Sequence, residues 1–283
     1  MKNYIFIKEF ISGLIKFRGK KPNIGKLQIW VGETCTLRCK ECSQLFPYIP
    51  KKIYDIDEVI KNTQMITKLC EIDSFHIIGG EPFTNKNILK LIKFICGQEH
   101  KELNKIVSNG TIIPDEATLK FLSENRDSIC VSISDYECAR DRQHKLAKIF
   151  VERNINHFHL NEDYVWFYMG NPSQCEIKDK KAIFRNFYAC HDRTCITLAD
   201  GELSICPRMH NSPKVFKHGY PPNEYLKISK LSENPNAFQR WIYKGLINAV
   251  LTDKTYREAC KFCYGNSNIN NKTVKRAEQL SRG

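Results

Sequence analysis

Residues 26–42 read KLQIWVGETCTLRCKEC, and this stretch decides the fold. Its first six residues form an apolar run that predicts a buried strand. Three thiols then follow within eight residues, on Cys35, Cys39 and Cys42. A tetrahedral zinc site takes four ligands, commonly in two pairs, and this loop offers no fourth thiol or histidine. Three thiolates on a four-iron cluster would instead leave one iron open, as a catalytic metal must be.

A second segment supports this interpretation. Residues 75–78 predict another strand, and Gly79-Gly80-Glu81-Pro82 follows it directly. The cysteine triplet and the GGEP segment, each placed after a strand, resemble the radical S-adenosylmethionine (SAM) superfamily over about residues 26–160. The resemblance implies a [4Fe-4S] cluster on the three cysteines and a GGEP segment that meets the amino group of SAM. Glu41 departs from the family, which usually has an aromatic residue or histidine there, near the adenine.

Strand and helix patterns alternate along the first half of the chain, which is typical of a parallel sheet or barrel. Further strands are expected at 106–108, 129–133 and 155–160, and helices at 55–70, 88–96, 114–122 and 141–153. The resemblance implies an α/β fold, a partial (β/α)6 TIM-like barrel, whose sixth strand is either 196–198 or an irregular segment before it.

Polar residues stand where the predicted strands end, and barrel active sites lie at the C-terminal ends of strands. The resemblance therefore implies that some of these residues contact the carboxylate and ribose of SAM. The candidates are Ser108, Asn109, Ser132 and Ser134. For any one of them, a role in satisfying the turn backbone is an equal alternative.

A second group of cysteines lies near the C-terminus. Ala199-Asp200-Gly201-Glu202 lies between apolar runs and predicts a β-hairpin. One cysteine ends the second hairpin strand, and a C-x-x-C pair follows later. The spacing fits zinc or an iron–sulfur cluster, since both take four thiolates. Beside the first motif it resembles the Twitch/SPASM-like auxiliary domain, which implies one auxiliary [4Fe-4S] cluster. The implied ligands are Cys190, Cys206, Cys260 and Cys263, with Cys195 as the spare thiol.

These patterns predict four parts in the chain. They are a basic N-terminal helix at 1–25, the partial barrel at 26–160, a connecting segment at 161–189 and the auxiliary cluster domain at 190–283. The first segment either closes the base of the barrel, which we prefer, or associates with a membrane surface. Charged residues interrupt it and no small-residue cleavage site follows, so it does not read as a signal peptide. No window holds the roughly 18 apolar residues of a membrane span.

The composition favours a cytoplasmic protein that binds metal. The chain has 13 cysteines and no recognised export signal, and cytosolic thiols that cluster serve metal binding or catalysis more often than disulfides. Cys70, Cys96 and Cys130 are expected to be small buried hydrophobes. The net charge of +13 favours an anionic partner. No stacking-aromatic motif accompanies it, which argues against specific nucleic-acid binding.

The resemblance implies an enzyme that reductively cleaves SAM to a 5′-deoxyadenosyl radical, which abstracts hydrogen from the substrate. An electron donor such as flavodoxin or ferredoxin would be its partner. An auxiliary cluster can accept an electron, so we expect an oxidoreductase that oxidises a sugar or alcohol carbon of a small, sugar-like or anionic molecule. The whole chain also resembles uncharacterised radical SAM proteins from polysaccharide gene neighbourhoods.

Three alternatives stay open. The first is an epimerase that uses Cys195 or Cys175 to return hydrogen, and the second is a peptide-modifying enzyme. The third is a non-enzymatic, zinc-binding basic interaction module. No catalytic base is assigned, although Arg208 and His210 follow a proposed ligand closely enough to reach an active site.

Overall fold

The computed structural model describes residues 2–159, 165–170, 172–173, 176–252, 254–270 and 272–281. Its main sheet is formed by β1 (Asn23–Trp30), β2 (Glu71–Ile78), β3 (Asn104–Ser108), β4 (Ile129–Ile133), β5 (His157–His159), β7 (Thr197–Ala199), β8 (Glu202–Ser204) and β9 (Leu226–Lys227). These strands lie in the order β5-β4-β3-β2-β1-β7-β8-β9. The pairs from β5 to β7 are parallel, and the last two are antiparallel. The expected α/β fold with a mostly parallel sheet is confirmed.

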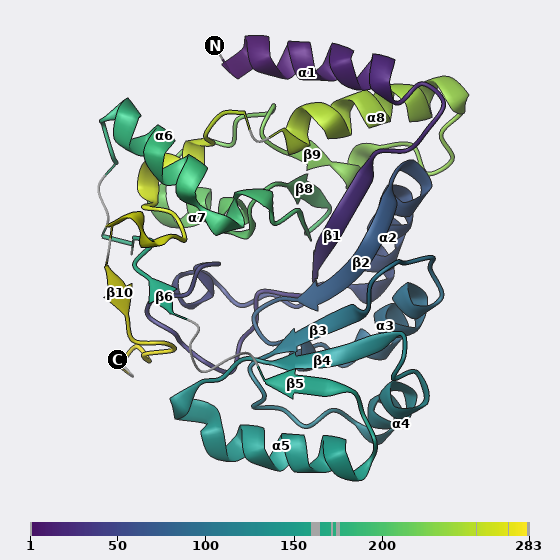
Figure 1. The fold of residues 1–283 in the computed structure, drawn as a ribbon, viewed down its shortest axis with the longest axis vertical. Helices are drawn as coiled ribbons and strands as arrows, with labels where there is room; N and C mark the ends of the chain where they lie inside the picture. The colour runs from purple at the N-terminus through teal and green to yellow at the C-terminus, as the bar shows by residue number, and fades with distance from the viewer. Residues whose placement is uncertain are drawn as a thin grey trace.

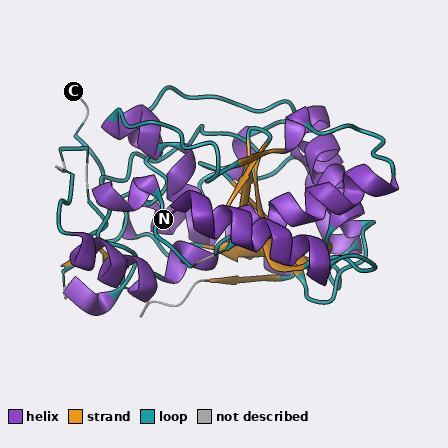
Figure 2. Ribbon diagram, turned by 90° about the horizontal axis from the view of Figure 1, so that it is seen from above, coloured by secondary structure: helices purple, strands orange, loops and turns teal. Residues whose placement is uncertain are grey.

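The helices are α1 (Lys2–Lys16), α2 (Ile56–Leu69), α3 (Ile88–Cys96), α4 (Glu116–Glu124), α5 (Arg140–Glu152), α6 (Lys180–Ala189), α7 (Ser212–Phe216) and α8 (Ala237–Leu251). In Figure 1, α2, α3 and α4 lie to the right of the strands and α6 and α7 to the left. Seen from above, helices flank the strands on both sides (Figure 2). A separate antiparallel pair joins β6 (Trp166–Phe167) to β10 (Thr273–Val274).

Local signals fix several of these bounds. α2 begins after Asp55, whose side chain accepts a hydrogen bond from the Asp57 amide at 3.0 Å. α4 was expected to open at Pro114, but its N-cap is Asp115, which accepts from the Thr118 amide at 2.8 Å. Proline tolerates the first helical position, yet the aspartate satisfies a free backbone N–H. The capping residue therefore sets the start.

The predicted hairpin forms and extends the main sheet. Asp200 (φ 49°) and Gly201 (φ 75°) both adopt left-handed conformations, as a two-residue turn between antiparallel strands requires. The first hairpin strand, β7, pairs in parallel with β1, with Ile29 opposite Leu198. The sixth parallel strand is thus β7, which corresponds to 196–198, one of the two alternatives that the sequence left open, and it lies beside β1. Through β8 the hairpin continues the main sheet.

The core lies between the sheet and its helices. Leu27, Ile29, Phe75 and Val131 are completely buried. At the N-terminus the expected basic helix forms as α1, and it packs along α8 (Figure 1). Among the described residues, no helix has the length and apolar character needed to cross a membrane.

Candidate active site

The three N-terminal cysteines lie in the loop that follows β1. This loop is held by backbone hydrogen bonds from the segment after β2: the Gly80 amide donates to the Gly32 carbonyl (3.1 Å), and the Glu81 amide donates to the Thr34 carbonyl (2.9 Å). The cysteine loop and the GGEP segment therefore form one unit at the C-terminal ends of two adjacent parallel strands.

Gly79 and Gly80 permit this contact because neither has a side chain. A Cβ atom on Gly80 would lie 2.2 Å from the Thr34 carbonyl oxygen and 2.8 Å from the Cβ of Cys35. A Cβ atom on Gly79 would lie 2.8 Å from the Gly32 carbonyl oxygen. Both glycines are thus required by close approach of two backbones.

We expect Gly80→Ala to lower the free energy of unfolding by about 1–3 kcal/mol, since overpacking displaces the Thr34 backbone. Thermal unfolding of the metal-free protein measures this effect. The iron content after reconstitution shows whether the displaced cysteine loop still binds a cluster. The matched control is Gly25→Ala in β1, whose Cβ would meet only Asp73 at 3.9 Å. Equal unfolding midpoints for the two variants would contradict the close-approach argument.

A cavity of about 360 Å³ brings together most of the predicted site residues. Its walls include Glu41 and the side chains or backbone of Cys35, Cys39, Cys42, Gly79, Gly80, Ser108, Asn109 and Ser134. Three predicted residues, Glu81, Pro82 and Ser132, are buried and are not among those that line it. The cavity thus lies against the ends of β1 to β4.

Glu81 does not line this cavity, but its carboxylate binds residues that do. One carboxylate oxygen accepts from the Ser108 hydroxyl (2.9 Å) and the Phe83 amide (3.2 Å), and the other accepts from the Asn109 amide (2.8 Å). The Ser108 hydroxyl in turn accepts from the Gly110 amide at 2.9 Å. In this structure Glu81 and Ser108 are therefore bonded to each other, and the carboxylate positions the turn after β3.

Burial raises the pKa of the Glu81 carboxyl to about 7, although its hydrogen bonds oppose the shift. The folded protein thus holds this proton more tightly than the unfolded chain does. We expect the free energy of unfolding of the metal-free protein to fall as the pH rises from about 4.5 to about 7. Thermal unfolding across this range should show a flatter profile for Glu81→Gln but not for the exposed control Glu124→Gln. An unchanged slope in Glu81→Gln would refute the assignment.

Gln143 joins the neighbouring turns, a role that was not predicted from the sequence. Its amide nitrogen donates to the Asn109 carbonyl (2.8 Å) and to the Ser134 carbonyl (2.6 Å), so it ties the end of β3 to the end of β4. The residue lies three positions before Leu146 on the buried face of α5. A polar residue on an apolar helical face was the available signal.

Donor groups surround the first thiols. Cys35 accepts from the Leu37 amide (3.4 Å) and from the Asn109 side chain (3.5 Å), and Cys39 accepts from the Gln279 side chain (3.5 Å). Burial raises the pKa of Cys35 to about 11 and that of Cys39 to about 12, and the nearby Cys42 adds to both shifts. Bound metal reverses this preference, because it holds the thiols as thiolates.

The C-terminal tail packs against the same loop. The Lys40 amide donates to the Glu278 carbonyl (2.8 Å), and the Leu280 amide donates to the Arg38 carbonyl (2.9 Å). Cys39 and Gln279 form an isolated antiparallel bridge between these bonds. The tail therefore holds the middle cysteine through backbone pairing, separately from the GGEP segment, which binds Gly32 and Thr34.

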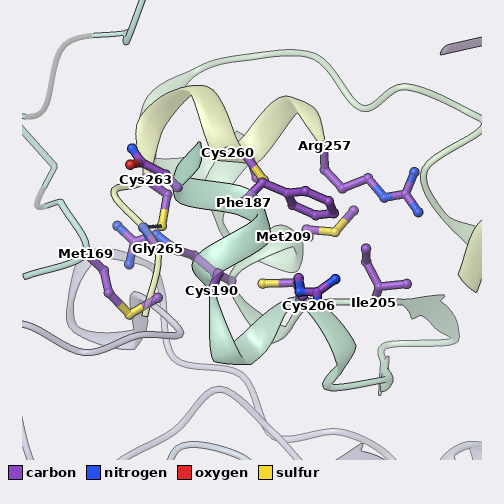
Figure 3. A pocket seen from close by; sticks show the side chains of 14 residues that line it. Met169, Phe187, Cys190, Ile205, Cys206, Met209, Arg257, Cys260, Cys263 and Gly265 are labelled. Carbon is purple, nitrogen blue, oxygen red and sulfur yellow. Dashed lines mark hydrogen bonds between the residues drawn. The ribbon is translucent and has the colours of Figure 1, made fainter. Parts of the chain in front are cut away.

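A second cavity is lined by four cysteines from three segments of the chain (Figure 3). Cys190 follows α6, Cys206 follows β8, and Cys260 and Cys263 lie in and just after a short 3₁₀ helix. Backbone amides point at two of the thiols: that of Asn266 donates to Cys190 (3.2 Å), and that of Gly265 donates to Cys263 (3.3 Å). Cys195 is not among the lining residues.

Arg208 lies between the two cavities. It is 2% exposed and lines the second cavity. One terminal nitrogen donates to the carbonyl of Ser43 (3.2 Å), the residue that follows Cys42. The other terminal nitrogen donates to the Gly170 carbonyl. Its Nε is buried without a hydrogen-bond partner in the described chain. The guanidinium thus places a buried positive charge beside both groups of thiols.

His210 does not reach either cavity. Its Nε2 lies 3.0 Å from the Ser204 hydroxyl, and its ring lies 5.4 Å from that of Trp30. Burial lowers its pKa to about 3, so the ring is neutral. We therefore assign it to the core, and Cys175, the other thiol considered for hydrogen return, lies outside the described residues.

In the described part of the chain, no group of three or more His, Cys, Asp or Glu side chains is arranged to hold a metal ion. The thiols stand instead around the walls of the two cavities.

Known structures match part of this chain. They include native anSMEcpe with bound AdoMet and Cp18Cys peptide (23% identity, TM-score 0.37, 47% of this chain and 42% of that chain). They also include SuiB of Streptococcus suis bound to precursor peptide SuiA (19% identity, TM-score 0.42, 54% of this chain and 36% of that chain). The matches thus span less than half the length of either protein.

A family match covers the strands and loops that build the first cavity. The radical SAM superfamily matches residues 30–166, which contain the cysteine triplet, the GGEP segment and the turns after β3 and β4. This chain is therefore similar to the radical SAM superfamily over residues 30–166, just under half of its length.

Proposed function

We propose that this chain is a radical SAM oxidoreductase with two [4Fe-4S] clusters. In this proposal one cluster and SAM occupy the cavity at the C-terminal ends of β1 to β4. An auxiliary cluster occupies the cavity that is lined by four cysteines. The proposed ligands are Cys35, Cys39 and Cys42 for the first cluster and Cys190, Cys206, Cys260 and Cys263 for the second.

The donor sets support these assignments. Three thiols face a cavity in the first site and four in the second, which are the numbers that an open and a closed four-iron cluster need. Each iron takes its own thiolate, so thiols spread around a cavity suit a cluster. A zinc ion instead draws four sulfurs to within about 2.3 Å of one point. Amide donors toward Cys35, Cys39, Cys190 and Cys263 would stabilise bound sulfur.

The remaining residues would bind and orient SAM. When bound, the cluster and SAM supply the radical that removes hydrogen from a substrate carbon. Gly79, Gly80, Asn109 and Ser134 line the cavity, and their polar groups are the proposed contacts to SAM. Asn109 is itself oriented, because its amide nitrogen donates to the Thr36 hydroxyl at 3.1 Å. Phe46, Ile78 and Met169 provide apolar walls that limit access of water.

The single observation that supports the proposed oxidation is the position of Arg208. Because it touches the Cys42 loop and lines the auxiliary cavity, the two sites are neighbours. Oxidation of a carbon that bears a hydroxyl to a carbonyl removes one hydrogen atom, one proton and one electron. The auxiliary cluster is the proposed acceptor of that electron. A sugar-like or alcohol substrate fits this balance, and a flavodoxin or ferredoxin is the proposed electron donor.

The test uses protein reconstituted with iron and sulfide without oxygen. It is incubated with SAM, dithionite and a panel of deuterated sugars and alcohols. We expect 5′-deoxyadenosine, deuterium transfer into it from one substrate class, and a carbonyl product. A cysteine-containing peptide serves as the comparison substrate. Absence of 5′-deoxyadenosine from cluster-loaded protein would refute the proposal, and transfer from the peptide alone would reassign the substrate.

A further inference from the structure

α1 exposes a line of large apolar side chains. Tyr4, Ile7, Ile11 and Ile15 have exposed fractions of 71%, 56%, 51% and 76%. Their spacing of three or four residues places them on one face of the helix. We call these four residues the α1 stripe. Scattered apolar residues on a surface are ordinary, but four in a row along a helix form a continuous patch.

The opposite face of α1 is already occupied by α8. The Trp241 indole donates to the Leu14 carbonyl and the Asn248 amide donates to the Glu9 carbonyl, both at 2.7 Å. Gly13 lies so close to α8 that a Cβ atom there would be 2.7 Å from the Cβ of Asn248. The helix is therefore held against the fold by the face opposite the stripe, and the stripe is exposed in the described structure.

The stripe lies in a strongly basic region. Residues 2–21 and 237–251 contain eight basic residues and one acidic residue. The acidic residue, Glu9, is buried and forms an ion pair with Lys254 at 2.6 Å. The basic residues that are exposed are Lys8, Lys16, Arg18, Lys20, Lys21 and Arg240. On α8, Phe238 adds a further aromatic ring that is 65% exposed.

The combination of positive charge and apolar surface indicates which kind of partner would bind the stripe. A second copy of the chain would bring two basic surfaces together, so self-association through the stripe is opposed by charge. Anionic lipid headgroups complement the lysines, and the acyl boundary accepts the isoleucines. α1 also lies along the outer edge of the molecule, so a membrane there leaves the two cavities free (Figure 1).

We propose that the α1 stripe, together with Phe238 and the surrounding basic residues, binds an anionic membrane surface with α1 lying in the plane of the interface. Binding is reversible, because one helix with a few buried side chains gives a modest affinity. It is independent of the proposed redox chemistry.

Co-sedimentation with vesicles tests this inference on the intact, cluster-loaded protein. One set of vesicles is phosphatidylcholine with phosphatidylserine at about 7:3, and the other is phosphatidylcholine alone. We expect wild-type protein to pellet with the anionic vesicles and binding to weaken at least tenfold without phosphatidylserine or in high salt. Equal binding to both vesicles, or none to either, would overturn the proposal.

Substitution separates the stripe from general charge. Ile7→Ser/Ile11→Ser/Ile15→Ser keeps every lysine and is expected to weaken vesicle binding at least tenfold. The control is Ile113→Ser/Val151→Ser, which removes exposed apolar residues that belong to neither α1 nor α8. Circular dichroism and vesicle-free 5′-deoxyadenosine formation report folding of both variants. Unchanged vesicle binding by the triple variant would overturn the proposal. So would a wild-type dimer that the triple variant converts to monomer.

Discussion

Cys39→Ala is expected to abolish 5′-deoxyadenosine formation and to remove about four of about eight irons per chain. This thiol is the middle ligand of the proposed open cluster, and it is held between the GGEP-bound loop and the C-terminal tail. With two thiolates left, the cluster loses both an iron ligand and the fixed geometry of the loop. Iron and sulfide analysis, together with product chromatography, measures the two effects in one preparation.

Cys70→Ala provides the control for this experiment. Cys70 is also buried, but it ends α2 and belongs to the main hydrophobic core. We expect the iron content and the SAM cleavage of Cys70→Ala to match those of the wild type. If Cys39→Ala keeps all its iron and its full activity, the first cluster is not where we place it.

Cys206→Ala is expected to separate SAM cleavage from substrate oxidation. Cys206 is partly buried and lines the second cavity, and desolvation raises its pKa well above the usual value. Loss of this ligand should remove about four irons and leave the first cluster in place. We then expect 5′-deoxyadenosine to form while the carbonyl product falls to background, since the electron acceptor is lost.

Cys195→Ala distinguishes the proposed ligand from its neighbour. Cys195 lies close in sequence but does not line the cavity, so this variant should keep about eight irons and normal product formation. If Cys195→Ala instead loses the auxiliary iron and Cys190→Ala retains it, the ligand assignment is reversed. Epimer formation that depends on Cys195 would favour the epimerase alternative.

Local patterns predicted much of the sheet and its helices. α3 and β4 have the expected bounds, and Asp200-Gly201 makes the expected turn. Each of these features depends on residues within a few positions of one another: apolar periodicity, or a turn dipeptide that tolerates positive φ. The predicted start of α4 at Pro114 was wrong. Proline and the following aspartate both favour a helix start, and the helix begins after the Asp115 cap.

Contacts between distant segments were beyond prediction from the sequence. The pairing of β7 with β1 joins residues near 28 to residues near 197, and no local pattern encodes it. The position of Arg208 against the Ser43 carbonyl and the bond from Gln279 to Cys39 are of the same kind. The sequence could place thiols at strand ends, but their supporting residues depend on how the chain returns to them.

The bond between the tail and the cysteine loop has a consequence for biosynthesis. Gln279 follows Cys39 by 240 residues, and a ribosome that adds about 5–20 residues per second needs roughly 10–50 s to cover that distance. During this interval the nascent loop lacks the strand partner that holds its middle thiol. We therefore expect iron and sulfide to be inserted after release of the chain, or with an assembly factor protecting the early loop.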